Sequence, residues 1–147
     1  MLKNLDPLLG PDLLHVLASM GHGDELAVVD ANFPAASFAR RLVRVDGASA
    51  TAVVRAVLSV MPLDTFVDAP LASMAVVGDA AAVPEAVREF DGIASKAHGS
   101  EAKRDALDRN AFYARAQSAY AIVQTGETRL YANLLLRKGV VQPGTVA

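Results

Sequence analysis

Residues 21–30 have the sequence GHGDELAVVD, a glycine-rich turn followed by a short apolar run that ends in an acid. The run from Glu25 to Asp30 is continuous rather than alternating, which is typical of a strand buried on both faces of a sheet. Sheets with both faces covered by helices belong to α/β folds, and they open onto a crevice where their strands end. This stretch therefore predicts a central strand with the Asp30 carboxylate at a candidate site.

Helices are expected where apolar residues recur at helical spacing between typical start and stop residues. Proline or aspartate stands near three of the predicted starts, and glycine or proline ends two of the segments. Segments with these features cover residues 11–20, 49–61, 84–96 and 106–117. The chain therefore alternates predicted helices with short strands.

Two further strands are predicted at 42–45 and 71–77, each a short apolar run. The segments 119–123 and 129–136 flank a glycine-containing turn at 124–128, which is typical of a β-hairpin. Helices, strands and one antiparallel hairpin together predict an α/β fold. We expect a single domain over the whole chain, with a mixed β-sheet flanked by helices.

The composition excludes several classes of protein. Of the 147 residues, 52% are hydrophobic and 20% are charged, which argues against disorder and indicates apolar surface buried between subunits of a homo-oligomer. The net charge of −2 gives no basic footprint for nucleic acid. Without cysteine there is no disulfide framework, and no apolar run has the roughly 18 residues that a membrane span needs. We therefore expect a cytoplasmic protein with neither a nucleic-acid nor a membrane partner.

His22 is the candidate acid or base. It stands between Gly21 and Gly23, where small neighbours admit a ligand, and an imidazole can give and take a proton near neutral pH. The alternative is an exposed residue in a Schellman-type helix stop. His15 is expected on a helix surface and His98 in a loop, and the three histidines lack metal-ligand spacing, so we predict no metal site.

Asp30 is a candidate acceptor for the hydroxyls of a polyol, and Arg109 is a candidate partner for a ligand or a carboxylate. A carboxylate at a strand end either caps the following loop or accepts two hydroxyl donors with charge-assisted strength. Arg109 stands early in a predicted helix, where a cation opposes the helix dipole. That placement is explained either by simple solvation or by an anionic or ligand partner.

Tyr131 and Asn133 are two residues apart on a predicted strand, so their side chains are expected on one face. Their apolar surroundings favour a hydroxyl-binding role over solvent exposure, whereas Glu127 and Arg129 are expected to be solvated. The chain contains no GxGxxG, GxxxxGK[ST], GxSxG or HExxH motif. It therefore lacks the common signatures of nucleotide binding, triad hydrolysis and zinc proteolysis.

These pieces together resemble the RbsD/FucU family of L-fucose mutarotases and D-ribose pyranases. The resemblance extends from about residue 5 to residue 140. It is carried by the order and spacing of GHGDE at 21–25, DANFPA at 30–35, RNAFY at 109–113, RAQ at 115–117, TGE at 125–127, YAN at 131–133 and KGV at 138–140.

The resemblance implies a sugar isomerase that opens and recloses a pyranose ring by acid–base chemistry without a cofactor. It also implies a ring-shaped homo-oligomer, typically a decamer, with sugar sites between subunits. By motif position, His22 would be the proton donor, and Asp30 and Arg109 would hold sugar hydroxyls. The pocket would be completed by Tyr131, Ala132 and Asn133.

Arg109 and the segment 32–34 (NFP) resemble the fucose branch, because the ribose branch has histidine at the first position and a different loop. Asn32 and Asn110 depart from many fucose enzymes. The expected function is an L-fucose mutarotase that interconverts the α and β anomers of L-fucose or a related aldose. The alternatives are a D-ribose pyranase and a noncatalytic sugar-binding or transport-accessory protein.

Overall fold

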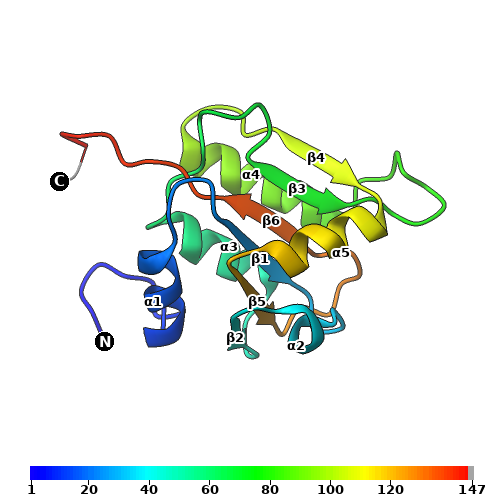
Figure 1. The fold of residues 1–147 in the computed structure, drawn as a ribbon, viewed down its shortest axis with the longest axis horizontal. Coiled ribbons are helices and arrows are strands. Elements are labelled where there is room, and N and C mark those ends of the chain that lie inside the picture. Colours follow the sequence, from blue (N-terminus) through cyan, green and yellow to red (C-terminus); the bar gives the residue numbers. More distant parts are fainter. Residues whose placement is uncertain (146–147) are drawn as a thin grey trace.

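Six strands form one mixed sheet at the centre of the molecule (Figure 1). The structure, a computed structural model, describes residues 1–145. The strands are β1 (Glu25–Val29), β2 (Leu42–Val45), β3 (Leu71–Met74), β4 (Arg104–Leu107), β5 (Ala121–Thr125) and β6 (Leu134–Arg137). Their order is β2-β5-β1-β6-β3-β4, and β6 runs antiparallel to both of its neighbours while the other pairs are parallel.

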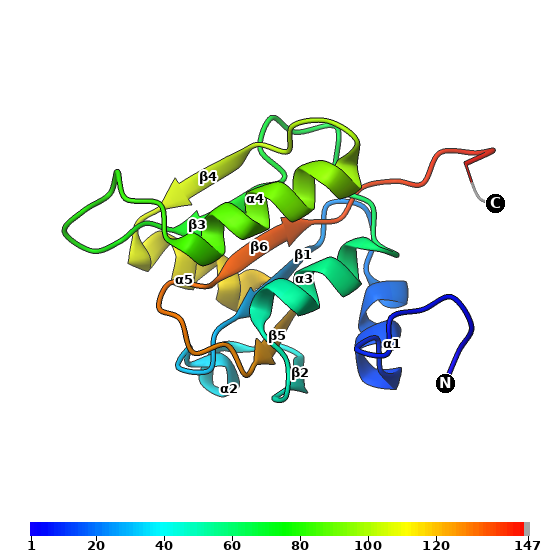
Figure 2. The same ribbon diagram turned by 180° about the vertical axis from the view of Figure 1, so that it is seen from behind.

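Helices cover both faces of this sheet. They are α1 (Pro11–Ser19), α2 (Ala35–Phe38), α3 (Ala50–Leu58), α4 (Glu85–His98) and α5 (Arg109–Ser118). The core on one face contains residues of α1, α3 and α4, and the core on the other contains residues of α2 and α5. Figure 2 shows α3 and α4 in front of the sheet, and Figure 1 shows α5 in front of the opposite face.

Strand β1 is the central strand that its apolar run predicts. Leu26 and Val28 belong to one core, Ala27 and Val29 belong to the other, and all four are fully buried. A strand with helices on both faces has no solvent-facing side, which explains the absence of alternation in its sequence. The prediction of a buried strand is confirmed.

The predicted hairpin between residues 119–123 and 129–136 is wrong. Strands β5 and β6 both form, but β1 lies between them, parallel to β5 and antiparallel to β6. A fully apolar strand gains more from a central position than from an edge, because both of its ladders are then paired and both faces are covered. The segment from 126 to 133 is therefore a connection across β1 and not a tight turn.

Several predicted boundaries also move. The segment 104–107 pairs with β3 as strand β4, so α5 begins at Arg109 rather than at residue 106. Asp108 is the N-cap of α5, and its side chain accepts the Ala111 N–H at 2.9 Å. Helix α4 continues to His98, expected in a loop, and ends where Gly99 takes a φ of 78°. The strand predicted at 71–77 stops at residue 74.

The candidate site residues lie near two edges of the sheet. The carboxyl edge is the one where β1, β3 and β4 end and where the antiparallel β6 begins. The amino edge is the one where β1 begins and β6 ends. The length of β1, about 16 Å for five residues at about 3.3 Å each, separates the two edges. In the described part of the chain, no helix is both long and apolar enough to cross a bilayer.

Candidate functional site

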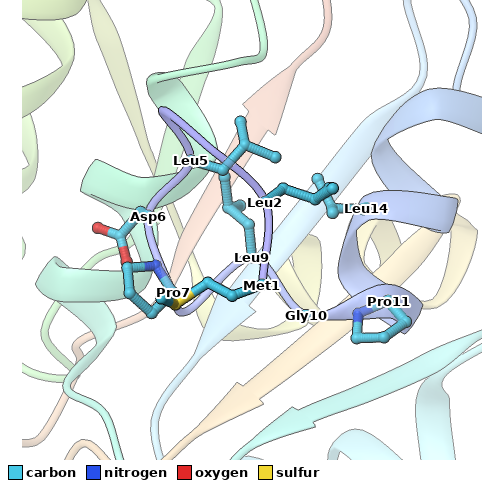
Figure 3. Close-up of a pocket in the computed structure, with 9 residues that line it drawn as sticks. All are labelled: Met1, Leu2, Leu5, Asp6, Pro7, Leu9, Gly10, Pro11 and Leu14. Carbon is cyan, nitrogen blue, oxygen red and sulfur yellow. The ribbon is translucent and has the colours of Figure 1, made fainter.

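An apolar pocket of about 400 Å³ lies between the N-terminal segment and the start of α1 (Figure 3). Asp6 is the charged residue among those that line it, and its carboxylate accepts the N–H of Leu8 at 2.9 Å. Pro11, at the start of α1, lines the pocket, whereas His22 follows the opposite end of that helix. This pocket is therefore apart from the polar residues that carry the candidate chemistry.

His22 lies at the amino edge, in the turn between α1 and β1. The Schellman-type helix stop is wrong, because Met20 at the helix end has extended backbone and the positive φ of 87° occurs only at Gly23. The turn is held instead by Lys138, whose ammonium donates to the carbonyls of Leu17 and Met20 at 2.8 and 2.6 Å. The His22 side chain is 46% exposed, so the imidazole is accessible to a ligand.

Asp64 is the partner of this imidazole. Its Oδ1 lies 3.0 Å from His22 Nε2 and also accepts the N–H of Phe66 at 3.0 Å. Its Oδ2 accepts from Arg137 Nε at 3.1 Å. Only 2% of Asp64 is exposed, so a buried carboxylate is surrounded by three donors, two of them able to carry positive charge.

The charge of Asp64 decides which nitrogen of His22 is free. Burial alone would raise the pKa of Asp64, but the hydrogen bonds from Phe66, His22 and Arg137 outweigh it and hold that pKa below its ordinary value. An ionised carboxylate accepts only, so Nε2 of His22 must carry the proton in this contact. Nδ1 is therefore the nitrogen left to exchange a proton with a ligand.

Replacing Asp64 with asparagine is expected to make the free energy of unfolding less dependent on pH in the acidic range. Because the folded pKa of Asp64 is below its ordinary value of 3.8, its ionised form stabilises the fold above that pH. This contribution is lost as the pH falls through the folded pKa. Urea unfolding between about pH 6 and about pH 3 should show the wild-type advantage over the Asp64→Asn variant shrinking in acid.

The matched control is Asp68→Asn. Asp68 pairs with Lys103 at 3.2 Å but its side chain is 86% exposed, and such surface pairs contribute little. This variant should follow the wild type at every pH. A difference between the wild type and Asp64→Asn that stays constant across the pH range would contradict the assigned role of the Asp64 charge.

Asp30 lies at the carboxyl edge and is held by Asn133, which directly precedes β6. The Asn133 amide donates to Asp30 Oδ2 at 3.0 Å, and its carbonyl oxygen accepts the Asp30 N–H at 2.8 Å. Asp30 Oδ1 accepts the N–H of Asn32 at 2.9 Å. Burial raises the pKa of Asp30 against the opposing effect of these hydrogen bonds, and the charge of Glu127 raises it further.

Tyr131 and Asn133 are not on a strand, contrary to the prediction. Strand β6 begins at Leu134, and Tyr131 has a φ of 61°, so the two-residue alternation of a strand does not apply to them. The Tyr131 hydroxyl instead accepts the N–H of Val77 at 3.2 Å, just beyond the end of β3. Ala132 between them is fully buried. The connection itself, and not a pleated surface, presents these residues at the carboxyl edge.

Glu127 and Arg129 are not simply solvated. Glu127 is 4% exposed, and its carboxylate accepts from the Ala50 N–H at 3.3 Å and from the Arg129 guanidinium at 3.0 Å. Arg129 also donates to Glu89 of α4, and it is the main cause of the lowered pKa of Glu127. The backbone carbonyl of Glu127 accepts the Ala31 N–H at 2.9 Å. These contacts tie the connection before β6 to the loop that follows Asp30.

Arg109 is exposed at the first position of α5. Since β4 ends immediately before this helix, Arg109 starts from the same edge of the sheet as Asp30. Strand β4 is three strands from β1, which corresponds to about 14 Å at about 4.8 Å per strand. The structure thus places Arg109 at the same edge as Asp30 without a contact between them.

The predicted site residues therefore form two groups. Asp30 and Asn133 are in contact at the carboxyl edge, with Tyr131, Ala132 and Arg109 at the same edge. His22 lies at the amino edge, separated from them by the length of β1. Within residues 1–145, no three histidine, aspartate or glutamate side chains are placed to hold a metal ion. The arrangement therefore has an accessible imidazole at one edge and a group of polar side chains at the other.

Asp64 is the candidate site residue that the sequence analysis did not identify. It is 42 residues from His22 along the chain, in the loop after α3. No motif spacing joins the two, because the contact depends on how that loop returns to the end of β6. One local signal was available: Asp64 is an acid that directly follows the apolar residues 61–63 at the end of a predicted helix.

The chain belongs to the RbsD / FucU transport protein family, whose model matches residues 3–141. It is 41% identical over 140 residues to a protein of Actinobacillus pleuropneumoniae serotype 5b (strain L20) named L-fucose mutarotase. That match covers 95% of this chain and 97% of the relative.

Two solved structures extend the comparison. The fucose mutarotase of Streptococcus pneumoniae, in complex with L-fucose, is 43% identical with a TM-score of 0.88, covering 96% of this chain and 100% of that one. The RbsD protein of Bacillus subtilis, complexed with D-ribose, is 21% identical with a TM-score of 0.74, covering 97% and 100%. This second likeness shows a shared fold. The expected family and the mixed sheet flanked by helices are confirmed.

Proposed function

We propose that this protein is an L-fucose mutarotase, an isomerase that interconverts the α and β anomers of L-fucose or a closely related aldose. The observation that carries the proposal is the pairing of His22 with Asp64, which leaves one imidazole nitrogen free at an accessible surface. The substrate class is supported by the similarity over nearly the whole chain to proteins named L-fucose mutarotase.

The proposed reaction needs only proton transfers. His22 Nδ1 delivers a proton to the ring oxygen of the pyranose, a solvent water takes the proton of the anomeric hydroxyl, and the bond between C1 and the ring oxygen breaks. The open aldehyde rotates about the C1–C2 bond, and the hydroxyl on C5 adds to its other face. His22 recovers its proton from that hydroxyl and the water returns a proton to the former carbonyl oxygen, so the enzyme is restored without a cofactor.

Asp64 supports both halves of this cycle. His22 becomes positively charged whenever it holds a proton on both nitrogens, and the buried carboxylate stabilises that charge at 3.0 Å. The same contact fixes the orientation of the ring. Arg137 balances the Asp64 charge when the imidazole is neutral, so the carboxylate is never left buried without a partner.

The carboxyl edge would hold the sugar hydroxyls. Each Asp30 oxygen already accepts one hydrogen bond and has a second lone pair for a hydroxyl donor. Asn133 fixes the plane of that carboxylate through two hydrogen bonds. Arg109 and Tyr131 add polar groups around it, and Ala132 would take part through its backbone because its side chain is a buried methyl group.

A complete site in this scheme needs two copies of the chain. His22 and Asp30 are at opposite edges, so the amino edge of one copy must face the carboxyl edge of the next. Such contacts join different surfaces and are heterologous, and they generate a closed ring when the rotation between copies closes. We therefore propose a ring-shaped homo-oligomer, with the decamer expected for the family. The cytoplasmic location expected from the sequence stays a prediction.

Saturation-transfer NMR of sugar solutions tests the proposal. The wild-type protein should accelerate exchange between the α and β signals of L-fucose at catalytic protein concentrations. Acceleration confined to pyranose–furanose exchange of D-ribose would favour a pyranase instead. Calorimetric binding of L-fucose with no acceleration of anomer exchange would favour a noncatalytic sugar-binding protein.

A further inference from the structure

An exposed phenyl ring lies beside the candidate proton donor. Phe66 is 69% exposed, and its ring centroid is 5.3 Å from that of His22 at an interplanar angle of 56°. Other apolar side chains, Leu130 among them, are exposed as well, so what distinguishes Phe66 is that it lies next to the imidazole that the mechanism uses. This position suggests that Phe66 contacts a ligand bound at His22.

The position of Phe66 is fixed by the same carboxylate that holds His22. Its backbone N–H donates to Asp64 Oδ1 at 3.0 Å, and the Asp64 N–H donates to the Arg137 carbonyl at 3.0 Å. The loop is therefore anchored to the end of β6 directly before the phenyl ring. Phe66 and His22 are held by one buried group, which keeps the two rings adjacent.

We propose that Phe66 is a specificity-determining residue that contacts the C6 methyl group of a 6-deoxy sugar. This inference rests on the proposed function. If His22 exchanges a proton with the ring oxygen, the atoms nearest that oxygen are C1 and C5, and C6 is attached to C5. A side chain about 5 Å from the imidazole is thus placed to reach the substituent on C5.

The chemistry of the two groups fits. A methyl group leaves water favourably against an aromatic face, whereas a hydroxymethyl group at the same place would lose a hydrogen bond to water without gaining one. Discrimination on one such group in an apolar pocket is about tenfold or more in kcat/KM. Phe66 would therefore favour a 6-deoxy sugar over its 6-hydroxy counterpart.

Three sugars that differ only at C5 test this role. L-Fucose has a methyl group there, L-galactose a hydroxymethyl group and D-arabinose only hydrogen. Phe66→Ala should lower kcat/KM for L-fucose by about tenfold and leave D-arabinose unchanged, so that the preference among the three sugars is lost. Phe66→Leu keeps apolar bulk and should retain most of the preference.

The controls separate this inference from the proposed function. Leu42→Ala removes another exposed apolar side chain, on the edge strand β2, and should leave all three sugars unaffected. Equal losses on L-fucose and D-arabinose in Phe66→Ala would overturn the methyl contact while leaving the mutarotase function intact. A wild-type protein that accelerates exchange of none of these sugars would overturn the proposed function itself.

A second measurement does not depend on turnover. In protein that is deuterated except at phenylalanine, a nuclear Overhauser effect from phenyl protons to the L-fucose methyl group is expected. It should disappear in Phe66→Leu prepared in the same way. Persistence of the signal in that variant would assign the methyl contact to another phenylalanine and overturn the inference.

Discussion

Replacing His22 with alanine is expected to lower the acceleration of L-fucose anomer exchange by a factor on the order of 10² to 10⁴, the usual contribution of a positioned acid–base group. The reason is that Nδ1 of His22 supplies the proton for the ring oxygen, and Asp64 cannot replace it from its buried position. Saturation-transfer NMR measures the exchange rate. Thermal unfolding followed by circular dichroism should show a variant that remains folded, because the imidazole is half exposed.

His15→Ala is the matched control for this prediction. His15 is exposed on α1, as the sequence predicts, and its removal should leave the exchange rate unchanged. An exchange rate in His22→Ala equal to that of the wild type would remove this residue from the mechanism. A loss of activity in both variants would point instead to damage at the contacts of α1.

Co-assembly of two inactive variants is expected to restore activity. His22→Ala removes the donor at the amino edge, and Asp30→Ala removes the hydroxyl acceptor at the carboxyl edge. In a head-to-tail ring assembled at random from equal amounts, about one quarter of the sites would combine an intact His22 with an intact Asp30 from the neighbour. The mixture, refolded together from denaturant, should therefore recover about one quarter of the wild-type exchange rate.

Arg109→Ala provides a second partner for the same experiment. Asp30 is buried and its removal leaves Asn133 without an acceptor, whereas Arg109 is exposed at the same edge. Simple mixing of the folded variants without subunit exchange should give no recovery. If each copy held a whole site, neither pair of variants would recover any activity after refolding together, and the shared site would be wrong.

Local patterns predicted the elements better than their arrangement. The run from Glu25 to Val29 and the segment 42–45 form the strands expected, since apolar runs between turns are local properties. The hairpin was wrong because its signal describes neighbours in sequence, and here β1, about 100 residues earlier, pairs with both strands. The order of β5, β1 and β6 in the sheet depends on which strand gains most from the central position, and this is not a local property of the sequence.

The candidate site residues also differ in whether the local sequence could identify them. His22 and Asp30 can be proposed from the sequence because they flank one apolar strand, next to turn residues. Asp64 could not be proposed in this way, because its candidate role depends on a contact with His22, 42 positions away in the sequence. Asn133 was identified on a wrong premise: it faces Asp30 through a pair of hydrogen bonds spanning 103 positions, not through the alternation of a strand.

The separation of the two edges by β1 has a consequence for how activity arises in time. In the proposed assembly, a newly folded copy carries a proton donor that faces open water and a cradle for hydroxyls that no donor can reach. A single folded copy is therefore inactive, and turnover begins only when copies assemble. The rate at which active sites form after synthesis would follow the square of the concentration of unassembled chains. At low protein concentration the enzyme would therefore stay inactive.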